Sequence, residues 1–272
     1  MKHPTISTMM LAYNEETVIG EAIQSILDQT YEDWELIIVD DGSTDGTPDV
    51  VARFEDPRIR YVRQENQGRG AARNAALRAS RGQYIAIADA DDISLPSRFQ
   101  KQVAFLEAHP EVGVVSAQLK FFTARHAPTY LFDFPVEKDA IQARFSQGFM
   151  GVAHPASMIR RVVFDSIGNY AEECLRAQDL ELFLRASDHF SFATLPEVLV
   201  LYRNDPGAVS FQKWVSVSLF RHYANYRYRC WQRHVYAKPF SSWQKHPRVW
   251  ATILTWDVLR FLRQKAQFKL SD

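Results

Sequence analysis

The stretch that decides the fold reads Tyr84-Ile85-Ala86-Ile87-Ala88-Asp89-Ala90-Asp91-Asp92, in which an apolar run delivers three carboxylates to one loop. Carboxylates this close together repel one another, so such a cluster is typical of a site for a hard divalent cation. An apolar run that ends in acids also fits the carboxyl edge of a parallel sheet, where open α/β folds bind ligands. A solvated acidic turn is the alternative for an isolated motif of this kind.

Strand-like and helix-like segments alternate on both sides of this stretch. Buried strands are expected over residues 6–12, 35–39, 59–62, 83–88 and 112–122. Helices are expected between them: one capped by Asn14, one from Thr47 to Phe54, one over 70–80 and one from Pro96 to Glu107. This order predicts a parallel sheet covered by helices.

Beyond residue 122 the pattern is less regular. Residues 123–150 are expected to form a loop region over the site. A strand over 157–160, a helix over 178–187 and a strand over 198–202 follow from the apolar spacing. The final segment, 211–272, has a helical pattern that is interrupted by prolines.

Acidic residues end the second strand as well as the fourth. Asp40-Asp41 can accept hydrogen bonds from a nucleobase imide or a ribose hydroxyl, and Asp89-Ala90-Asp91 can hold a metal that bridges two phosphates. Gly68 and Gly70 permit close backbone approach, and Arg73 can neutralise a phosphate or form a helix-surface salt bridge. The glycines of this region match neither the P-loop nor the dinucleotide fingerprint.

The composition bounds the class of protein. A chain of 272 residues that is 46% hydrophobic and 24% charged suits one large globular domain, alone or with an appendage. Cys174 and Cys230 stand in no CxxC pattern, which argues against a disulfide framework or structural zinc and fits a reducing compartment. The chain begins without a signal-peptide pattern and has no long uncharged apolar run, so we expect a cytoplasmic protein without a membrane span.

The net charge of zero hides a division of charge along the chain. Residues 1–210 hold 20 basic and 30 acidic residues, whereas residues 211–272 hold 12 basic and 2 acidic ones. The second segment also contains 14 aromatic residues. This shift predicts an organisational boundary near residue 210 and an anionic partner for the tail.

Two runs of the chain resemble a known family. Residues 6–47, ISTMMLAYNEETVIGEAIQSILDQTYEDWELIIVDDGSTDGT, and residues 66–92, NQGRGAARNAALRASRGQYIAIADADD, are similar to the N-terminal half of family 2 glycosyltransferases of the GT-A fold, with its DxD motif. The resemblance extends over roughly residues 4–205 and rests on several spaced motifs in the right order. It implies a mixed, mainly parallel α/β sheet sandwiched by helices. It also implies a catalytic domain over 1–210, with a nucleotide-sugar half (1–120) and an acceptor half (121–210), followed by a helical appendage over 211–272.

The resemblance also assigns roles to residues at the strand ends. Tyr13 and the backbone at Leu11 would flank the nucleobase and Asp41 would hydrogen-bond it. Asp91 would ligate Mn²⁺ or Mg²⁺, with Asp89 and Asp92 as further candidates, although Asp92 can equally cap the following turn. The full set of implied nucleotide-sugar contacts is Leu11, Tyr13, Glu15, Asp41, Asn66, Arg73, Asp89, Ala90 and Arg203.

The family's catalytic base falls in the stretch RAQDLELFLRA. The matching residue is Asp179, and Gln178 stands where the family usually has a glutamate, so the acceptor contacts at this position differ. Asp179 can alternatively be the N-cap of the helix that follows. His154 is a candidate for the acceptor wall. Asp205 stands where the family often has a histidine, so a metal role there is not expected.

The implied reaction is a single in-line displacement of a nucleoside diphosphate, most simply UDP, by an acceptor hydroxyl, with inversion at the anomeric carbon. The expected acceptor is a glycan or lipid-linked sugar of surface polysaccharide, lipopolysaccharide or glycolipid assembly. Two other hypotheses are a sugar-nucleotide nucleotidyltransferase and a non-catalytic protein that binds nucleotide sugars. The first is disfavoured because the turn at residues 12–15 is acidic and has no glycine.

The basic, aromatic-rich tail has two interpretations. Interleaved basic and aromatic residues suit an anionic membrane surface, and Trp250, Leu254, Val258 and Phe261 share one face of an expected last helix. The same apolar face can instead pack on the catalytic domain or form a homodimer. Nucleic-acid binding is not expected.

Overall fold

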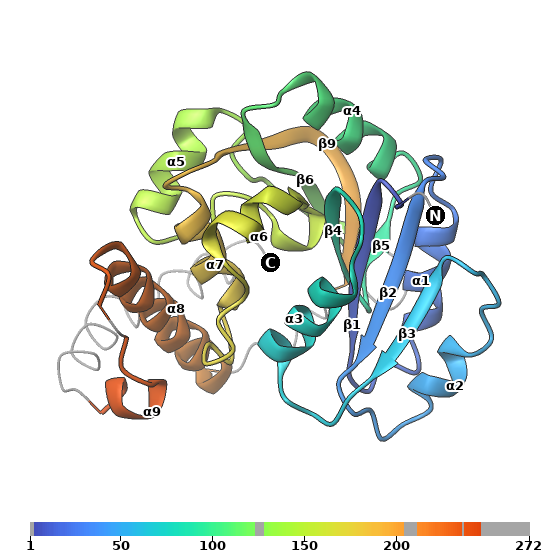
Figure 1. Ribbon diagram of the computed structural model, residues 1–272, viewed down its shortest axis with the longest axis horizontal. Helices are drawn as coiled ribbons and strands as arrows, with labels where there is room; N and C mark the ends of the chain where they lie inside the picture. Colours follow the sequence, from blue (N-terminus) through green and yellow to red (C-terminus); the bar gives the residue numbers. More distant parts are fainter. Residues whose placement is uncertain (1–2, 123–127, 204–210, 236, 246–272) are drawn as a thin grey trace.

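The computed structural model describes residues 3–122, 128–203, 211–235 and 237–245. Within these residues a nine-stranded sheet runs in the order β3-β2-β1-β4-β8-β6-β9-β5, with β7 paired to β6 (Figure 1). The strands are β1 (Ile6–Ala12), β2 (Trp34–Asp40), β3 (Ile59–Arg63), β4 (Tyr84–Asp89), β5 (Ile93–Ser94), β6 (Val112–Phe122), β7 (Pro128–Phe132), β8 (Met158–Arg160) and β9 (Ser191–Arg203).

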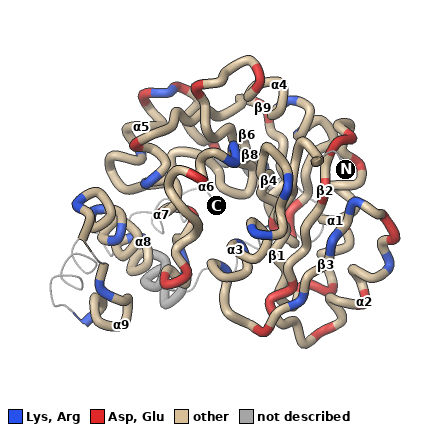
Figure 2. Tube along the Cα trace, in the orientation of Figure 1, with Lys and Arg blue, Asp and Glu red and all other residues tan. Residues whose placement is uncertain are grey.

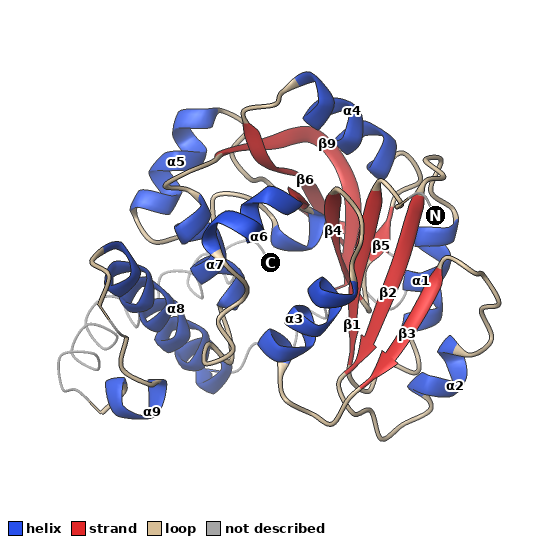
Figure 3. Ribbon diagram, viewed as in Figure 1, coloured by secondary structure: helices blue, strands red, loops and turns tan. Residues whose placement is uncertain are grey.

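Helices cover both faces of the sheet (Figure 3). They are α1 (Ile19–Leu27), α2 (Thr47–Val51), α3 (Arg69–Ala79), α4 (Arg98–Ala108), α5 (Lys138–Ser146), α6 (Arg161–Ile167), α7 (Gln178–Ala186), α8 (Phe211–Gln232) and α9 (Phe240–Trp243), with a 3₁₀ turn at His154–Ala156. The strands alternate between two cores, because successive side chains point to opposite faces. In β4, Ile85 and Ile87 pack with α3 and α7, whereas Tyr84, Ala86 and Ala88 pack with α1 and α4.

The first four long strands form the parallel part of the sheet. β1 pairs in parallel with both β2 and β4, and β2 pairs in parallel with β3. The expected parallel, α-covered sheet is therefore confirmed for this part of the chain. β8 then inserts antiparallel between β4 and β6, so that the sheet continues without a break into the second half of the chain.

Two local expectations were wrong. Residues 123–150 are not one loop region, because β7 pairs with β6 and α5 buries Ile141 and Phe145 at helical spacing. Asn14 does not cap a helix, since α1 begins at Ile19 and the Asn14 side chain instead accepts a hydrogen bond from the backbone N–H of Thr44 at 2.8 Å.

Helix α8 packs against the part of the chain that forms the sheet and its helices. Tyr223 and Ala224 are fully buried, and the Asn225 amide donates to the backbone carbonyl of Gly148 at 3.1 Å. The Tyr228 hydroxyl donates to Asp188 at 2.6 Å. The described part of α8 therefore packs on the domain, as one of the two interpretations of the tail expects. The expected amphipathic face of residues 250–261 lies outside the described residues. No helix in the described ranges is long and apolar enough to cross a membrane.

Candidate active site

Three strand ends meet at one edge of the sheet and form a cleft of ≈ 260 Å³. The register sets this meeting, because Ala12 lies opposite Asp40 and Leu11 lies opposite Asp89. Figure 2 shows acidic residues at the lower end of the sheet, where these strands finish. The cleft is lined by Leu11, Ala12, Tyr13, Glu15, Asp41, Asn66, Gly68, Arg69, Ala72, Arg73, Asp89, Ala90, Asp91 and Tyr202. Every expected nucleotide-sugar contact except Arg203 therefore lines one cleft, together with Asp91.

Asp41 organises the loop at one end of the cleft. Its Oδ1 accepts hydrogen bonds from the Gln64 amide at 2.7 Å and the Gln67 backbone N–H at 2.9 Å, and its Oδ2 accepts from the Gly68 N–H at 2.9 Å. A carboxylate has about four lone-pair positions, so one remains for a ligand. Gly42 is required beside it, because its φ is +83° and a Cβ there would lie 2.9 Å from the Asn66 nitrogen.

Arg73 has a donor group that no described residue uses. Its guanidinium lies 5.5 Å from the centre of the Tyr170 ring, and its Nη2 is 3.8 Å from Asp89. Nη1 is buried and has no hydrogen-bond partner among the described residues. A buried donor without a partner is costly, so a bound anion such as a phosphate would satisfy it.

The acidic loop is electrostatically crowded. Burial, followed by the charge of Asp89, raises the pKa of Asp91. Burial, followed by the charges of Asp89 and Asp91, raises the pKa of Asp92 well above its ordinary value. A bound cation would relieve this repulsion and favour the ionised carboxylates.

Two observations test whether these residues fit a divalent cation. Asp92 Oδ2 is buried without a hydrogen-bond partner in the described part of the chain. Across the same residues, no group of three or more His, Cys, Asp or Glu side chains is arranged to hold a metal. Mg²⁺ is commonly bound by one or two carboxylates together with substrate phosphates, rather than by an all-protein cage. The residues therefore fit a cation whose coordination the diphosphate of a substrate would complete.

Glu15 faces the acidic loop from the other side of the cleft. Burial, followed by the charge of Asp91, raises its pKa to about 7. Its backbone N–H donates to Thr47 Oγ1 at 2.8 Å, which fixes the turn after β1. Near neutral pH its carboxyl group can thus donate or accept a hydrogen bond, and either form can bind a hydroxyl group.

Arg98 supports the acidic loop from below. The side chain is fully buried, and it donates from Nη2 to the Ile87 carbonyl at 2.7 Å and from Nη1 to Ser94 Oγ at 2.9 Å. Burial lowers its pKa to about 10, against the opposing effect of the Asp92 and Asp89 charges. The sequence gives no sign of this role, because an arginine in a helix is normally exposed to solvent.

The side chains of Arg203 and Asp92 hold the loop together. The Arg203 backbone N–H donates to Asp92 Oδ1 at 2.9 Å, and its side-chain Nε donates to the Asp91 carbonyl at 2.9 Å. The guanidinium also pairs with Glu21 at 2.7 Å. Arg203 therefore binds the acidic loop instead of lining the cleft, and its contact with a diphosphate stays a prediction. Through its side chain Asp92 binds the backbone of β9, a contact that the capping of a turn would not explain.

His154 lies behind the cleft rather than on its surface. It is 3% exposed, and its Nε2 is 3.1 Å from the Tyr170 hydroxyl. Burial, followed by the charge of Arg73, lowers its pKa to about 4, so the imidazole is neutral at pH 7. His154 is therefore held by Tyr170 within the protein, and its contact with an acceptor stays a prediction.

Asp179 lies in the first turn of α7, partly exposed. The helix has no side-chain cap, and its N-cap position is Ala177, so the capping alternative for Asp179 is not observed. Asp179 is not among the residues that line the cleft, and its charge contributes to the pKa of both His154 and Tyr170. Gln178 is 3% exposed, and its Oε1 has no partner within the described residues. A direct acceptor contact from Gln178 stays a prediction.

Four residues that line the cleft were not expected there, and two of them, Arg69 and Tyr202, have polar side chains. Arg69 opens α3 between Gly68 and Gly70, and its position in the run NQGRGAARN was the available signal. Tyr202 comes from β9, and nothing in the local sequence links it to β4. The pairing of β9 with β6 brings it there.

Comparison with known proteins identifies the family. The profile described as "Glycosyl transferase family 2" matches residues 7–168. The chain is 32% identical over 245 residues to the uncharacterized glycosyltransferase MJ1057 of Methanocaldococcus jannaschii, covering 85% of this chain and 83% of that protein. The chain therefore belongs to glycosyl transferase family 2, and it is a glycosyltransferase. This excludes the nucleotidyltransferase hypothesis and the hypothesis of a non-catalytic binding protein.

A second relative carries a more specific name. UDP-Glc:alpha-D-GlcNAc-diphosphoundecaprenol beta-1,3-glucosyltransferase WfgD of Escherichia coli is 39% identical over 102 residues, covering 37% of this chain and 40% of that protein. The shared part is less than half of either protein, so the reaction of WfgD is not transferred by identity alone.

Solved structures share the fold. TarS 1–349 of S. aureus in complex with UDP has a TM-score of 0.62 and 21% identity, and the match covers 81% of this chain but 65% of TarS 1–349. The mannosyltransferase PcManGT of Pyrobaculum calidifontis, in complex with GDP-Man and Mn²⁺, has a TM-score of 0.61 and 22% identity, covering 88% of this chain and 67% of that one. The expected GT-A type, a mixed and mainly parallel sheet between helices, is confirmed.

Proposed function

We propose that this enzyme transfers a sugar from a nucleotide sugar, most simply a UDP-sugar, to an acceptor hydroxyl, with inversion and with dependence on Mn²⁺ or Mg²⁺. The observation that carries the proposal is the cleft at the ends of β1, β2 and β4, where Asp41, Arg73 and the acidic pair Asp89/Asp91 face one space. Carboxylates recognise a base or ribose, and an unpartnered arginine recognises a phosphate. A nucleoside diphosphate combines both chemistries.

The donor would lie along the cleft with its base at Tyr13 and Asp41. Tyr13 is 49% exposed, so its ring is free to stack, and Asp41 keeps one acceptor position beyond its three loop bonds. Glu15 would reach the ribose, and Arg73 would donate to a phosphate oxygen. Asn66, Asp89 and Ala90 would complete the contacts.

A divalent cation would be held by Asp91, with Asp89 or Asp92 as the second carboxylate. When bound, it would stabilise negative charge on the leaving diphosphate. The chain's own residues prepare this site: Arg98 and Arg203 hold the loop that carries the three acids.

Asp179 would accept the proton of the acceptor hydroxyl as that oxygen attacks the anomeric carbon. It is partly exposed, and its carboxylate accepts one described hydrogen bond, from the Leu180 N–H at 2.8 Å, which leaves it free to act. One base without a nucleophilic partner supports inversion, because retention would need a second carboxylate at the anomeric centre. Gln178 and the residues of the 121–210 half would contact the acceptor.

We further propose a glycan or lipid-linked acceptor in surface polysaccharide assembly, supported by the lipid diphosphate acceptor in the name of WfgD. Residues 1–210 would form the catalytic domain and act on the cytoplasmic side. Contact of the segment 211–272 with an anionic membrane is a separate proposal, and co-sedimentation with anionic and neutral vesicles tests it.

Release of nucleoside diphosphate from a panel of UDP-, GDP- and other sugar nucleotides, with and without Mn²⁺, tests the donor and the metal together. Asp91→Asn should lower turnover by about 10²–10³-fold and weaken UDP binding in Mn²⁺, because it removes a carboxylate from the metal site. Asp165→Asn, an exposed acid on α6, is the matched control and should behave like wild type. Full activity in excess EDTA would refute the metal role.

A further inference from the structure

The donor side and the base side of the site are joined by a contact between α3 and the loop over residues 169–177. Asn74 lies on α3 directly after Arg73 and is 4% exposed. Its Oδ1 accepts from the Tyr170 backbone N–H at 3.0 Å, and its Nδ2 donates to the Tyr170 carbonyl at 3.0 Å. One amide thus binds both backbone groups of a residue 96 positions further along the chain.

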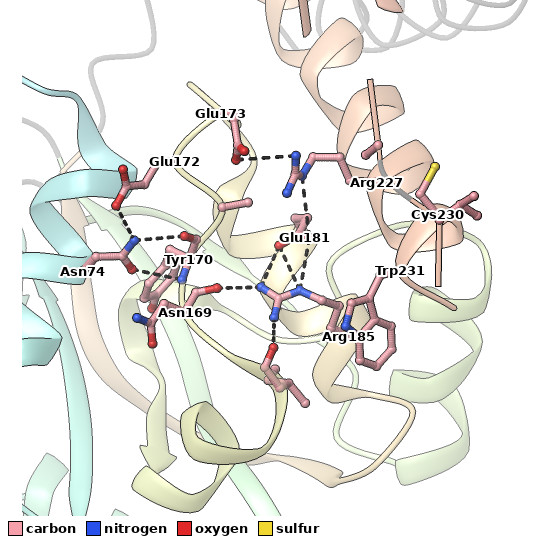
Figure 4. Close-up of a pocket in the computed structure, with 14 residues that line it drawn as sticks. Asn74, Asn169, Tyr170, Glu172, Glu173, Glu181, Arg185, Arg227, Cys230 and Trp231 are labelled. Carbon is pink, nitrogen blue, oxygen red and sulfur yellow. Dashed lines mark hydrogen bonds and ion pairs between the residues drawn. The ribbon is translucent and has the colours of Figure 1, made fainter. Parts of the chain in front are cut away.

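Figure 4 shows this contact on one wall of a second cavity, of ≈ 650 Å³, between α3, α7 and α8. Asn74 Nδ2 also donates to Glu172 at 2.8 Å. One turn earlier on α3, a Cβ on Gly70 would lie 2.9 Å from the Glu172 Cα, so the helix and the loop are in backbone contact. We call Gly70, Asn74, Tyr170 and Glu172 the latch.

The held residue, Tyr170, stands between the two chemical halves of the site. Its ring lies 5.5 Å from the Arg73 guanidinium, which belongs to the cleft. Its hydroxyl is 3.1 Å from His154 Nε2, and the charge of Asp179 acts to raise the pKa of both groups. Tyr170 thus contacts Arg73 on the side of the cleft, and the loop that follows Tyr170 leads into α7, whose first turn carries Asp179.

The chain between Tyr170 and Asp179 does not adopt a relaxed path. Ala177 has φ 57° and ψ 24°, in the left-handed region that a non-glycine residue rarely adopts. Such a conformation persists only where the surroundings over-determine it. Directly before Tyr170, Arg185 of α7 binds the chain by donating to the carbonyls of Ile167 and Asn169.

We propose that the latch is a positioning device for the transfer step, in which Asn74 acts through Tyr170 to hold Asp179 at its working distance from the donor. Asn74 does not line the cleft, so it is a positioning residue and not a catalytic one. This inference rests on the proposed function, because it presumes that Asp179 is the base.

The test uses two independent variants of the full chain. Asn74→Asp keeps the size of the side chain but places a carboxylate oxygen against the Tyr170 carbonyl and Glu172. Gly70→Ala pushes the same loop away with a methyl group. Each should lower kcat by about 10²-fold, since displacements near 1 Å have effects of that size. Asn74→Asp, which lies outside the cleft, should leave the Kd for UDP in Mn²⁺ unchanged by calorimetry.

A double-mutant cycle separates positioning from general damage. In an Asp179→Asn background, Asn74→Asp should have little further effect on kcat, because residues that act as a unit are not additive. Asn169→Ala, an exposed asparagine of the same loop, is the matched control and should resemble wild type. Full additivity, or a wild-type kcat in both latch variants, would overturn the inference while leaving the proposed function intact.

A second readout is independent of turnover. Amide hydrogen exchange, measured by mass spectrometry, should accelerate in residues 170–179 of Asn74→Asp and stay unchanged in the strands of the sheet. Unchanged exchange in this segment would also overturn the inference. A wild-type enzyme that transfers from no donor would instead count against the proposed function.

Discussion

The carboxylates around the cleft differ in how many hydrogen bonds they already accept, and this difference separates structural acids from acids that are free to react. Asp41 accepts three bonds that hold the loop over residues 64–68. Asp92 accepts the backbone N–H of Arg203 and is 5% exposed. Asp179 accepts one described bond and is partly exposed. An acid with few fixed partners keeps its lone pairs for a substrate proton, which favours Asp179 as the base.

Asp179→Asn should lower kcat by about 10²–10⁴-fold while leaving the affinity for UDP in Mn²⁺ close to that of wild type, because a base acts mainly in the transition state. Steady-state kinetics and calorimetry measure the two effects separately. NMR of the product should show the inverted anomeric configuration. A variant that loses both donor binding and its circular-dichroism spectrum would show that Asp179 is a structural residue.

His154 makes stability depend on pH. Its folded pKa is about 4, below the unfolded value of about 6.5, so the unfolded chain binds more protons between these values. The neutral His154 contributes on the order of 3 kcal/mol to the free energy of unfolding. This contribution is fully present above pH 6.5 and is lost as the pH falls towards 4.

Urea unfolding from pH 7 to pH 4.5 tests this prediction. His154→Gln should reduce the pH dependence of the unfolding free energy, because glutamine does not titrate and can still bond the Tyr170 hydroxyl. His3→Gln, which changes an exposed histidine, should reproduce the wild-type dependence. Identical slopes for wild type and His154→Gln would refute the burial argument.

At the scale of elements, the site depends on register. The pairing of β1 with β2 and β4 places their ends at one edge, and a shift of one residue would turn each acid to the other face. Helix α4 then holds the acidic loop through Arg98, and β9 holds it through Arg203. Elements far from the cleft in the sequence thus fix the geometry of its acids.

Helix α8 packs against the domain, and Tyr223 is the most buried large side chain among those that the structure describes in it. The centre of its ring lies 5.1 Å from the centre of the Phe240 ring and 5.2 Å from that of Trp243. Its hydroxyl donates to the Lys238 carbonyl at 3.0 Å. Tyr223→Ala should lower the unfolding free energy by about 3–5 kcal/mol, as truncation of a buried aromatic residue does.

Thermal unfolding followed by circular dichroism measures this loss, with Val235→Ala as the control at a position that is 56% exposed. The control should leave the Tm close to that of wild type. A Tyr223→Ala variant with an unchanged Tm would mean that α8 does not belong to the cooperative unit.

At the scale of the whole molecule, one sheet joins the two halves of the chain. β8 lies between β4 and β6, so the strands that end in the acids of the cleft and the later strands form one continuous sheet. The ion pairs of Arg227 with Glu173 at 3.5 Å and with Glu181 at 3.9 Å connect the basic tail to the acidic domain. Part of the charge division along the chain is therefore resolved by internal contact, as the docking interpretation requires.

The sequence by itself determined what local spacing encodes. Apolar runs that alternate with helical patterns predicted the parallel strands, and acids placed directly after these runs predicted a ligand site at their carboxyl edge, because both signals are carried by short segments and their order. The expected residues of the donor site, with the exception of Arg203, lie in one cleft for this reason.

Only the tertiary structure decided which distant groups meet. No local pattern predicts that Arg98 and His154 are buried. No local pattern relates Arg203 to the acidic loop or Asn74 to Tyr170, although the structure joins each pair by hydrogen bonds. The insertion of β8 between β4 and β6 and the packing of α8 on the domain also depend on contacts between distant parts of the chain. The physical reason is that a polar side chain in the core takes whichever partner the packing of the sheet and helices brings within hydrogen-bond reach, and that partner can stand anywhere in the chain.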